Sequence, residues 1–374
     1  MEILTLFSNF TNITPQMVLM WAIGGLLIYY LAIAKKMEPS LLLPMGFGAI
    51  LVNLPLSGAI TQGNIEGALS VLFEAGMSNE LFPLLLFIGI GAMIDFGPLL
   101  EKPWLLFFGA AAQAGIFLTL VLAGFFFDLK DAASIAIIGA ADGPTAIFVA
   151  NTLGSKYLGA IMVAAYSYMA LVPIVQPPVI RLVTTKKERL IRMPYQKGNV
   201  SRLTRILFPI LVTVIAGLVA PTSASLVGFL MFGNLLRECG VLNALSETAQ
   251  TTLANLITIV LGLTVASQMT AEQFVQPDTL LILALGLVAF VGDTIGGVLF
   301  AKLINLFLPE GKKINPMIGA AGISAFPMSG RVVNQMGLKE DNQNFLLMYS
   351  VSVNVSGQIA SVIAGGLILT LMGV

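Results

Sequence analysis

Apolar runs close to 20 residues long recur from one end of this sequence to the other. A helix of that length crosses the hydrocarbon core of a bilayer. Of the 374 residues, 57% are hydrophobic and only 10% are charged, which is far from the balance of a soluble domain. The runs do not alternate apolar and polar residues, and this excludes a transmembrane β-barrel. The sequence therefore predicts an all-α polytopic membrane protein.

The composition also restricts the chemistry. The chain has no histidine, which removes the usual general base and the usual transition-metal ligand. Its one cysteine, Cys239, excludes an internal disulfide and a thiolate metal cage. The formal net charge is zero, so nothing indicates binding to nucleic acid. The first residues lack a basic region and a small-residue cleavage site, and we expect no cleaved signal peptide.

An acidic residue interrupts the apolar pattern in the stretch Ile138 to Gly154, IGAADGPTAIFVANTLG. Asp142 is followed directly by Gly143 and Pro144, and proline both removes a helix donor and disfavours helix in the residue before it. We therefore expect two short helices that meet at a broken tip, with the carboxylate at the break. A carboxylate at membrane depth indicates a functional site; the alternative is that it only caps the helix that starts at Pro144.

A second stretch, Ile318 to Gly337, repeats this plan with the sequence IGAAGISAFPMSGRVVNQMG. Both stretches begin Ile-Gly-Ala-Ala and close at Asn-X-X-Gly. Paired broken helices in the two halves of a membrane protein indicate an ion or substrate site. The second stretch supplies neutral oxygens from Asn315, Ser324, Ser329 and the carbonyls freed near Gly319 and Gly322. Together with the carboxylate of Asp142, such oxygens suit an alkali cation.

The same layout of spans occurs twice along the chain. Spans are predicted at 17–34, 41–54, 82–93, 104–127 and 158–183, and again at 206–220, 226–236, 253–265, 280–308 and 345–372, with broken hairpins at 132–152 and 315–333. Two shorter sequence matches follow the same order, so we predict a duplicated unit. The predicted domains are a first membrane repeat at 17–185, a basic cytoplasmic linker at 186–202 and a second repeat at 203–374. Residues 57–79 suit either an interfacial or a re-entrant helix.

The distribution of charge predicts the topology. If the N-terminus lies outside and each hairpin re-enters, 17 of the 19 basic residues fall on the cytoplasmic side, as the positive-inside rule requires. Five crossings in each half make the repeats inverted. The predicted fold is two inverted repeats, each of about five transmembrane helices plus one re-entrant hairpin, with an elevator-like movement.

Four further polar residues fall within or next to apolar spans. Asn354 in the last span either belongs to the site or bonds a neighbouring helix. Tyr168 is either a proton donor or an interface anchor. Arg331 either pairs with an anionic substrate or marks the cytoplasmic side. Asp293, in the middle of a span, either serves a second ion or forms an ion pair.

Three segments carry a family resemblance: GAADGPTAIF, AAYSYMALVPIVQPP and IGIGAMIDFGPLLEKP. The chain resembles the β subunits of the sodium-translocating biotin-dependent decarboxylases over about residues 17 to 374. The resemblance implies a subunit of the bacterial cytoplasmic (inner) membrane that takes carboxybiotin from a biotin carrier protein, decarboxylates it with consumption of a proton, and moves Na+ outward. The implied partners are that carrier, a carboxyltransferase α subunit and a small single-span membrane subunit, and a homo-oligomer is expected.

The resemblance also implies roles for individual residues. The implied Na+ ligands are Asp142, Asn315, Gly319, Ser324 and Asn354. The implied catalytic residues are Asp142, Tyr168, Ser324 and Arg331, of which Tyr168 and Arg331 also hold carboxybiotin. A dry pocket favours loss of CO2 because it removes the solvation of the carboxylate.

Two other functions fit parts of the pattern. A Na+-coupled secondary carboxylate transporter would share the fold and the ion site but would need no biotin partner. A non-catalytic membrane scaffold would leave Asp142 unexplained. The sequence does not determine which acyl substrate the complex uses, although the compact length is closer to the glutaconyl-CoA or methylmalonyl-CoA branch than to the oxaloacetate branch.

Overall fold

The computed structural model describes residues 8–195 and 198–373; Lys197 and the first seven residues lie outside the described part. Every named element in these ranges is a helix. Seven of the described helices are long and apolar enough to cross a membrane, and a bent pair makes an eighth crossing if it counts as one span. The prediction of an all-α, multi-pass membrane protein is confirmed.

The first half of the chain runs from η1 to α12. Its elements are η1 (Ser8–Asn12), α2 (Pro15–Gly25), η2 (Leu26–Ala34), α3 (Pro39–Val52), α4 (Ala68–Gly76), α5 (Leu81–Met93), α6 (Gly97–Glu101), η3 (Pro103–Leu105), α7 (Leu106–Ala112), α8 (Ala114–Ala123), α9 (Leu129–Ala136), η4 (Ile137–Ala140), α10 (Gly143–Thr152), α11 (Leu158–Val183) and α12 (Lys186–Arg189).

The second half runs from α13 to α20. Its elements are α13 (Arg202–Val219), η5 (Pro221–Ser223), α14 (Ala224–Glu238), α15 (Asn243–Thr248), η6 (Ala249–Leu253), α16 (Ala254–Ala266), α17 (Ala271–Phe274), α18 (Pro277–Phe307), η7 (Glu310–Lys312), η8 (Pro316–Gly322), α19 (Met328–Glu340) and α20 (Leu347–Leu371).

Most predicted spans are present, and three details differ. Residues 57–79 include α4, which meets α5 at 66°. The span predicted at 104–127 is broken at Gln113, whose side-chain amide donates to the carbonyl of Gly109 at 3.0 Å. The first arm of the second hairpin is a 3-10 helix, and its second arm continues to Glu340 rather than ending at 333.

Glycine lets α5 and α14 cross at close range. A Cβ at Gly91 would overlap the carbonyl of Leu230, and a Cβ at Gly233 would overlap the carbonyl of Ile88. Small residues of this kind allow backbones to approach in membrane helix pairs, where there is no hydrophobic force between helices. The packing of α5 on α14 is accordingly the most extensive in the molecule.

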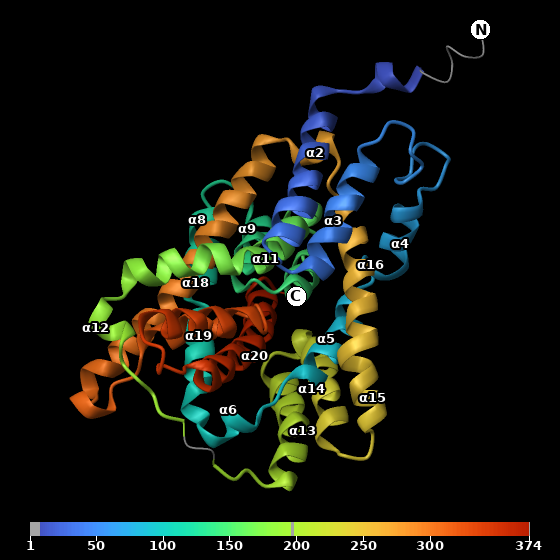
Figure 1. Cartoon of the computed structure of the whole chain (residues 1–374). Coiled ribbons are helices and arrows are strands. Elements are labelled where there is room, and N and C mark those ends of the chain that lie inside the picture. The colour runs from blue at the N-terminus through green and yellow to red at the C-terminus, as the bar shows by residue number, and fades with distance from the viewer. Residues whose placement is uncertain (1–7, 196–197, 374) are drawn as a thin grey trace.

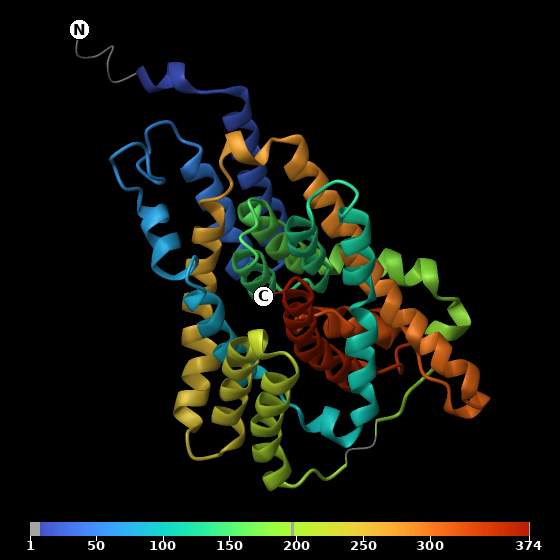
Figure 2. The same cartoon turned by 180° about the vertical axis from the view of Figure 1, so that it is seen from behind.

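The helices form two groups. In the scaffold group (α2, η2, α3–α5 and α13–α16), α3 packs on α16 and α5 on α14. In the hairpin group (α7–α11, η4, η8 and α18–α20), α18 packs against α7, α8, α11 and η8, and α20 packs against α7. Figure 1 shows α2, α3 and α16 beside each other, with the red helices α19 and α20 on the other side of the molecule. Figure 2 shows the same division from behind.

Each hairpin returns to the side from which it entered. At the ends of the first, Ser155 donates to Asp131 at 2.6 Å and Lys156 pairs with Asp131 at 3.5 Å. At the ends of the second, Asn315 and Asn344 both donate to the carbonyl of Arg189, at 2.9 and 2.8 Å. Residues 131–150 are all buried, so the irregular backbone of the first tip is enclosed by protein, as its unpaired polar groups require.

The crossing of α5 and α14 gives a stability prediction. Gly91→Ala should lower the free energy of unfolding by about 1–3 kcal/mol, because the new methyl group overlaps a backbone carbonyl that cannot move away. Gly25→Ala is the matched control, since no atom lies within 4 Å of the added Cβ. Thermal unfolding of the purified protein in detergent measures both. Equal midpoints for Gly91→Ala and the wild type would contradict the proposed packing constraint.

Candidate functional site

The first hairpin breaks at two consecutive residues. Ala141 has a left-handed conformation with φ 51° and ψ 44°, which costs an L-residue about 1–2 kcal/mol. Asp142 follows with an extended backbone, and Gly143 and Pro144 then begin α10. The predicted tip with a carboxylate at the break is therefore present, and only 3% of the surface of Asp142 is exposed.

The carboxylate of Asp142 is bound by two hydroxyl groups. Thr145 donates to Oδ2 at 2.7 Å and Ser361 of α20 donates to the same atom at 3.0 Å. Asp142 occupies the N-cap position of α10, but its side chain makes no N-cap hydrogen bond. It also has no ion-pair partner among the described residues. A buried carboxylate without a counter-charge is costly, so the site favours a cation.

The two hairpin tips meet beside this carboxylate. The backbone N–H of Ser324 donates to the carbonyl of Ala140 at 2.9 Å. From α20, the amide of Asn354 donates to the carbonyl of Ile323 at 2.7 Å, and the amide of Gln358 donates to the carbonyl of Ser324. One helix therefore holds the second tip against the first.

A polar stripe on α20 faces both tips. Asn354, Gln358 and Ser361 lie at positions i, i+4 and i+7, which share one face of a helix. Both Asn354 Oδ1 and Gln358 Oε1 are buried without a hydrogen-bond partner in the described structure. Buried acceptors of this kind require a ligand or water. In the described ranges no three Asp, Glu, His or Cys side chains gather. The groups that bond Asp142 or the second tip are neutral hydroxyls and amides, and a carboxylate with neutral oxygens is a set that suits a monovalent cation.

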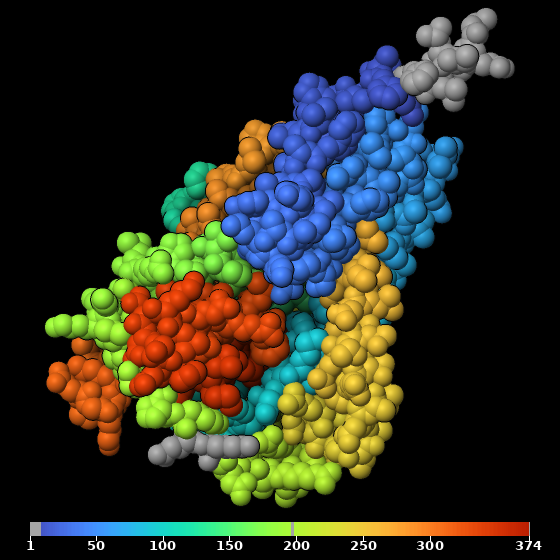
Figure 3. Space-filling model, in the orientation of Figure 1, coloured from blue at the N-terminus to red at the C-terminus, as the bar shows by residue number. Residues whose placement is uncertain are grey.

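A cavity of about 160 Å³ opens onto Asp142 between the two groups of helices. The hairpin group contributes Asp142, Tyr166, Ser324, Phe326, Pro327 and Gln358 to its lining. The scaffold group contributes Glu38, Leu41, Leu86, Ile90, Asn255 and Thr258. Figure 3 shows the surface hollowed where the red C-terminal helices face the blue and yellow helices of the scaffold group.

The structure brings some of the predicted ligands together and leaves others apart. Ser324 lines the cavity with Asp142, and Asn354 contacts the second tip. The side chain of Asn315 is occupied elsewhere: it accepts from the N–H of Met317 and donates to the carbonyls of Arg189 and Ile191. Gly319 packs directly on the backbone of Gly297 in α18. Asn315 and Gly319 are thus not among the residues around the cavity.

Two tyrosines of α11 point in different directions, because residues two positions apart lie on different helix faces. The predicted proton donor Tyr168 donates to the carbonyl of Leu283 and stacks with Phe290, both in α18. Tyr166 lines the cavity instead, with its ring directly over Gly143. Its hydroxyl is buried and has no partner in the described structure.

Asp293 is fully buried in α18 and makes no ion pair with a described residue. Its Oδ1 accepts from the N–H of Ile116 at 3.0 Å, at the start of α8 where the span breaks. Its Oδ2 lies against Gly139 of the first hairpin and has no hydrogen-bond partner in the described structure. Asp293 therefore caps the broken span from a neighbouring helix. Its contact with Gly139 also sets how closely the first hairpin approaches α18.

Sequence reasoning missed four residues of the site. Thr145, Gln358 and Ser361 contact Asp142 or the second tip, and Tyr166 lines the cavity. The spacing of Asn354, Gln358 and Ser361 within an apolar span was a usable signal, because it places three polar side chains on one helix face. No pattern in the sequence indicated that the side chain of Tyr166 points toward the cavity.

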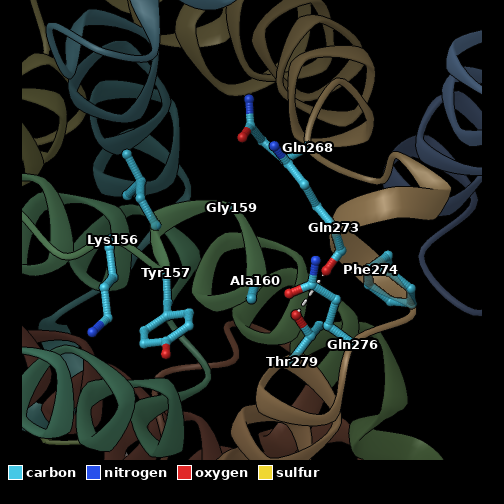
Figure 4. Close-up of a pocket in the computed structure, with 10 residues that line it drawn as sticks. Lys156, Tyr157, Gly159, Ala160, Gln268, Gln273, Phe274, Gln276 and Thr279 are labelled. Carbon is cyan, nitrogen blue, oxygen red and sulfur yellow. Dashed lines mark hydrogen bonds between the residues drawn. The ribbon is translucent and has the colours of Figure 1, made fainter.

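A second cavity, of about 280 Å³, lies near the ends of the first hairpin (Figure 4). One wall is the start of α11 around Gly159, and the other carries the side chains of Gln268, Gln273 and Thr279. Beside it, Tyr157 donates to Asp278 at 2.7 Å, and this bond raises the pKa of Tyr157 to about 12. This second cavity therefore lies between the start of α11 and the segment that joins α16 to α18, and Asp142 is not among its lining residues.

A polytopic helical protein whose two re-entrant tips enclose one carboxylate and several neutral oxygens belongs, by its architecture, to the ion-transporting membrane proteins. Comparison with known families is more specific. Residues 16–372 match the family described as the Na+-transporting oxaloacetate decarboxylase beta subunit, and the chain belongs to this family. It is therefore a membrane subunit of the sodium-pumping decarboxylases, which confirms the resemblance found in its motifs.

Similar proteins act on different substrates. The methylmalonyl-CoA decarboxylase subunit beta of Propionigenium modestum is 48% identical over 92% of each chain. The glutaconyl-CoA decarboxylase subunit beta of Acidaminococcus fermentans is 46% identical over 98% of this chain and 96% of the relative. The oxaloacetate decarboxylase beta chain of Klebsiella pneumoniae is 44% identical over 92% of this chain and 93% of the relative.

The hydroxyl of Ser361 offers a test of the site. Ser361→Ala removes one of the two hydrogen bonds that orient the carboxylate of Asp142. If this carboxylate binds Na+, the Na+ concentration for half-maximal activity should rise about tenfold. Ser352→Ala is the control, because Ser352 bonds only the carbonyl of Met348 in its own helix. The Na+ dependence of decarboxylation by the purified complex gives both values. A similar small shift in both variants would contradict this site.

Proposed function

We propose that this chain decarboxylates carboxybiotin, which a biotin carrier protein presents to it, and couples this reaction to outward transport of Na+. The observation that carries the proposal is the position of Asp142. It is a buried carboxylate without a counter-charge, at the junction of two hairpin tips, in the wall of a cavity between two groups of helices. Family membership supports the sodium-pumping class.

The proposed Na+ site has Asp142 as its only charged ligand. Thr145, Ser361, Ser324, Asn354 and Gln358 supply hydroxyl and amide oxygens around it. Na+ would provide the missing counter-charge and the missing partner of the two buried amide oxygens. Asn315 and Gly319 contribute by fixing the first arm of the second hairpin, through the linker carbonyls and the contact with α18.

The chemical step breaks the bond between a biotin nitrogen and its carboxylate. CO2 leaves, and the nitrogen takes one proton. The cavity is lined mainly by apolar side chains, which exclude water and weaken the solvation of the carboxylate. Arg331 follows Pro327, a lining residue, by one helical turn and is exposed, so it can attract the anionic substrate. Tyr168 supplies the proton in this scheme. Because its hydroxyl here donates to the carbonyl of Leu283 in α18, that bond must open and the side chain must turn toward the cavity before the proton is transferred.

Coupling requires that Na+ and carboxybiotin favour the same conformational state. We infer that the hairpin group moves as one body against the scaffold group, so that the cavity lined by Asp142 opens to one side of the membrane and then to the other. The two halves pack reciprocally: α3 on α16 mirrors α14 on α5, and α11 on α18 mirrors α20 on α7. This reciprocity supports inverted repeats at 17–185 and 203–374, joined by the linker 186–202.

The remaining assignments follow from the family. The proposed partners are the biotin carrier protein, a carboxyltransferase α subunit and a small single-span membrane subunit, in the bacterial cytoplasmic membrane, with this chain as a homo-oligomer. A Na+-coupled carboxylate transporter would have a similar ion site but would not decarboxylate free carboxybiotin. The purified complex distinguishes the two by CO2 release from that compound in the presence of Na+.

Removal of the single charged ligand tests the pump directly. Asp142→Asn keeps the shape and the hydrogen bonds from Thr145 and Ser361 but removes the charge. We expect it to abolish Na+-dependent decarboxylation and Na+ uptake into inverted vesicles, because a neutral site no longer balances the ion. Asp278→Asn, in the first turn of α18 and outside the cavity, should keep both activities. Normal Na+ dependence in Asp142→Asn would refute the ion site.

Phenylalanine variants of the two tyrosines test the proton donor. We expect Tyr168→Phe to lower the decarboxylation rate by at least about 100-fold, the usual contribution of a general acid. Tyr166→Phe removes a hydroxyl that has no partner in the described structure, so no group is left unsatisfied and the rate should stay within about threefold. Decarboxylation rates at saturating Na+ compare the two variants. A larger loss of rate in Tyr166→Phe than in Tyr168→Phe would identify Tyr166 as the proton donor.

A further inference from the structure

Each hairpin closes with the sequence Asn-X-X-Gly, and in the first hairpin this asparagine joins the two groups of helices. Asn151, near the end of α10 in the hairpin group, donates through Nδ2 to the carbonyl of Ser78 at 2.9 Å and to Oε1 of Glu80 at 3.1 Å. Ser78 and Glu80 lie in the turn between α4 and α5, in the scaffold group. One side chain thus bridges the boundary between the two groups by two hydrogen bonds.

This bridge is specific to the first hairpin. In the second hairpin, the matching Asn334 accepts a hydrogen bond from the N–H of Leu346 at 3.1 Å, and both residues belong to the hairpin group. The turn before α5 supplies what the bridge needs. Glu80 is the N-cap residue of α5 with a left-handed φ of 66°, which residues other than glycine adopt only rarely. Its side chain makes no cap hydrogen bond, so the carboxylate can accept from Asn151.

An apolar cluster separates the bridge from the cavity that contains Asp142. On four helices, a residue that lines the cavity lies one helical turn from a fully buried member of this cluster. The pairs, with the lining residue first, are Leu41 and Met45 in α3, Pro144 and Ile147 in α10, Tyr166 and Met162 in α11, and Leu261 and Val265 in α16. Asn151 lies one further turn along α10, and Met77 of the cluster directly precedes Ser78. The order along the helices is therefore cavity, apolar cluster and bridge.

The cluster and the bridge close the side on which the first hairpin ends. The ends of α3 and α16 meet there, because Asn53 donates to the carbonyl of Met269 at 2.8 Å, and Gln268 packs on Gly159 at the start of α11. The scaffold residues that line the cavity include Glu38 at the start of α3, Met93 at the end of α5 and Asn255 at the start of α16. These positions are at the opposite ends of their helices, so the cavity extends toward the linker side.

We propose that Asn151 is a positioning residue that latches the hairpin group to the scaffold group while the Asp142 cavity faces the linker side. The movement inferred above carries α10 away from the turn before α5, so both hydrogen bonds must break before the sealed side opens. The latch therefore stabilises the described conformation relative to the alternative one and sets how often the seal opens. This inference rests on the proposed function for the movement, whereas the two hydrogen bonds rest on the structure alone.

The first test measures how often the seal opens in the purified decarboxylase complex. Val163 belongs to the apolar cluster and is 1% exposed, so Val163→Cys reacts with N-ethylmaleimide only when the groups part. Cys239→Ser removes the one natural thiol of this chain, and mass spectrometry of the chain gives the reaction rate. In this background Asn151→Ala should raise the rate at Val163→Cys about threefold to tenfold, because the closed state loses two hydrogen bonds.

Two controls separate a latch from general loosening of the protein. Asn334→Ala removes a hydrogen bond inside one group and should change the rate at Val163→Cys by less than about twofold. Leu230→Cys moves the reporter to a buried residue in the crossing of α5 and α14, within the scaffold group, where the rate should not respond to Asn151→Ala. An unchanged rate at Val163→Cys in Asn151→Ala, or an equal rise in either control, overturns the proposal.

The second test immobilises the latch in the full complex. Asn151→Cys and Glu80→Cys, in the Cys239→Ser background, are joined by a bifunctional methanethiosulfonate reagent that a reductant removes. Na+ uptake and decarboxylation should fall at least about tenfold when the two groups are tied together, and reductant should restore both. Ala75→Cys with Asn79→Cys is the control pair, because both exposed residues lie in the scaffold group, where Asn79 donates to the carbonyl of Ala75 at 3.2 Å.

The outcomes distinguish the latch from the proposed function. Joining the control pair should leave both activities unchanged, and full turnover of the complex with Asn151→Cys joined to Glu80→Cys overturns the proposal. If the wild-type complex neither takes up Na+ nor decarboxylates carboxybiotin, the proposed function fails. The labelling rates at Val163→Cys, which need no turnover, then decide on their own whether Asn151 holds the two groups together.

Discussion

The structure depends on one unbalanced charge, the carboxylate of Asp142, held where two broken hairpins touch. Thr145 and Ser361 orient it by hydrogen bonds of 2.7 and 3.0 Å, but no described cation neutralises it. Much of the surrounding fold reduces the energetic cost of placing this tip at membrane depth. The first hairpin is buried along residues 131–150, so its freed backbone groups meet protein rather than lipid, and only such enclosure permits irregular chain at membrane depth.

The two tips are joined by backbone rather than by side chains. The bond from Ser324 N–H to the carbonyl of Ala140 fixes their relative position without reference to residue type. Side chains of α20 then add the chemistry, since Asn354 and Gln358 each bond the second tip through an amide nitrogen and leave an amide oxygen unpaired. In a site built in this way, the backbone sets the relative position of the two tips. A few side chains set which kind of ligand the site can bind.

Much of this could be predicted from the sequence, for identifiable reasons. A Gly-Pro pair after an aspartate within an apolar run breaks a helix whatever surrounds it, so the tip at Asp142 and its repeat near Ser324 could be located. The break of the span at Gln113 could not be predicted from the sequence. It depends on Asp293, a residue 180 positions away that caps α8 from another helix. Asn315 and Gly319 belong to the same arm as Ser324, yet their side-chain surroundings are set by the linker and by α18. Which face of α11 meets the cavity likewise depends on packing. The packing therefore determines that Tyr166, rather than Tyr168, lines the cavity.

The proposed ligands around Asp142 all belong to a single group of helices: Thr145 comes from the first hairpin, Ser324 from the second, and Gln358 and Ser361 from α20. None comes from the scaffold group. In the proposed movement, an ion bound there would cross the barrier within one coordination shell, without exchanging ligands on the way. Under this proposal, selectivity for the ion would be a property of the hairpin group alone, and the scaffold group would determine only which side of the membrane the site opens toward.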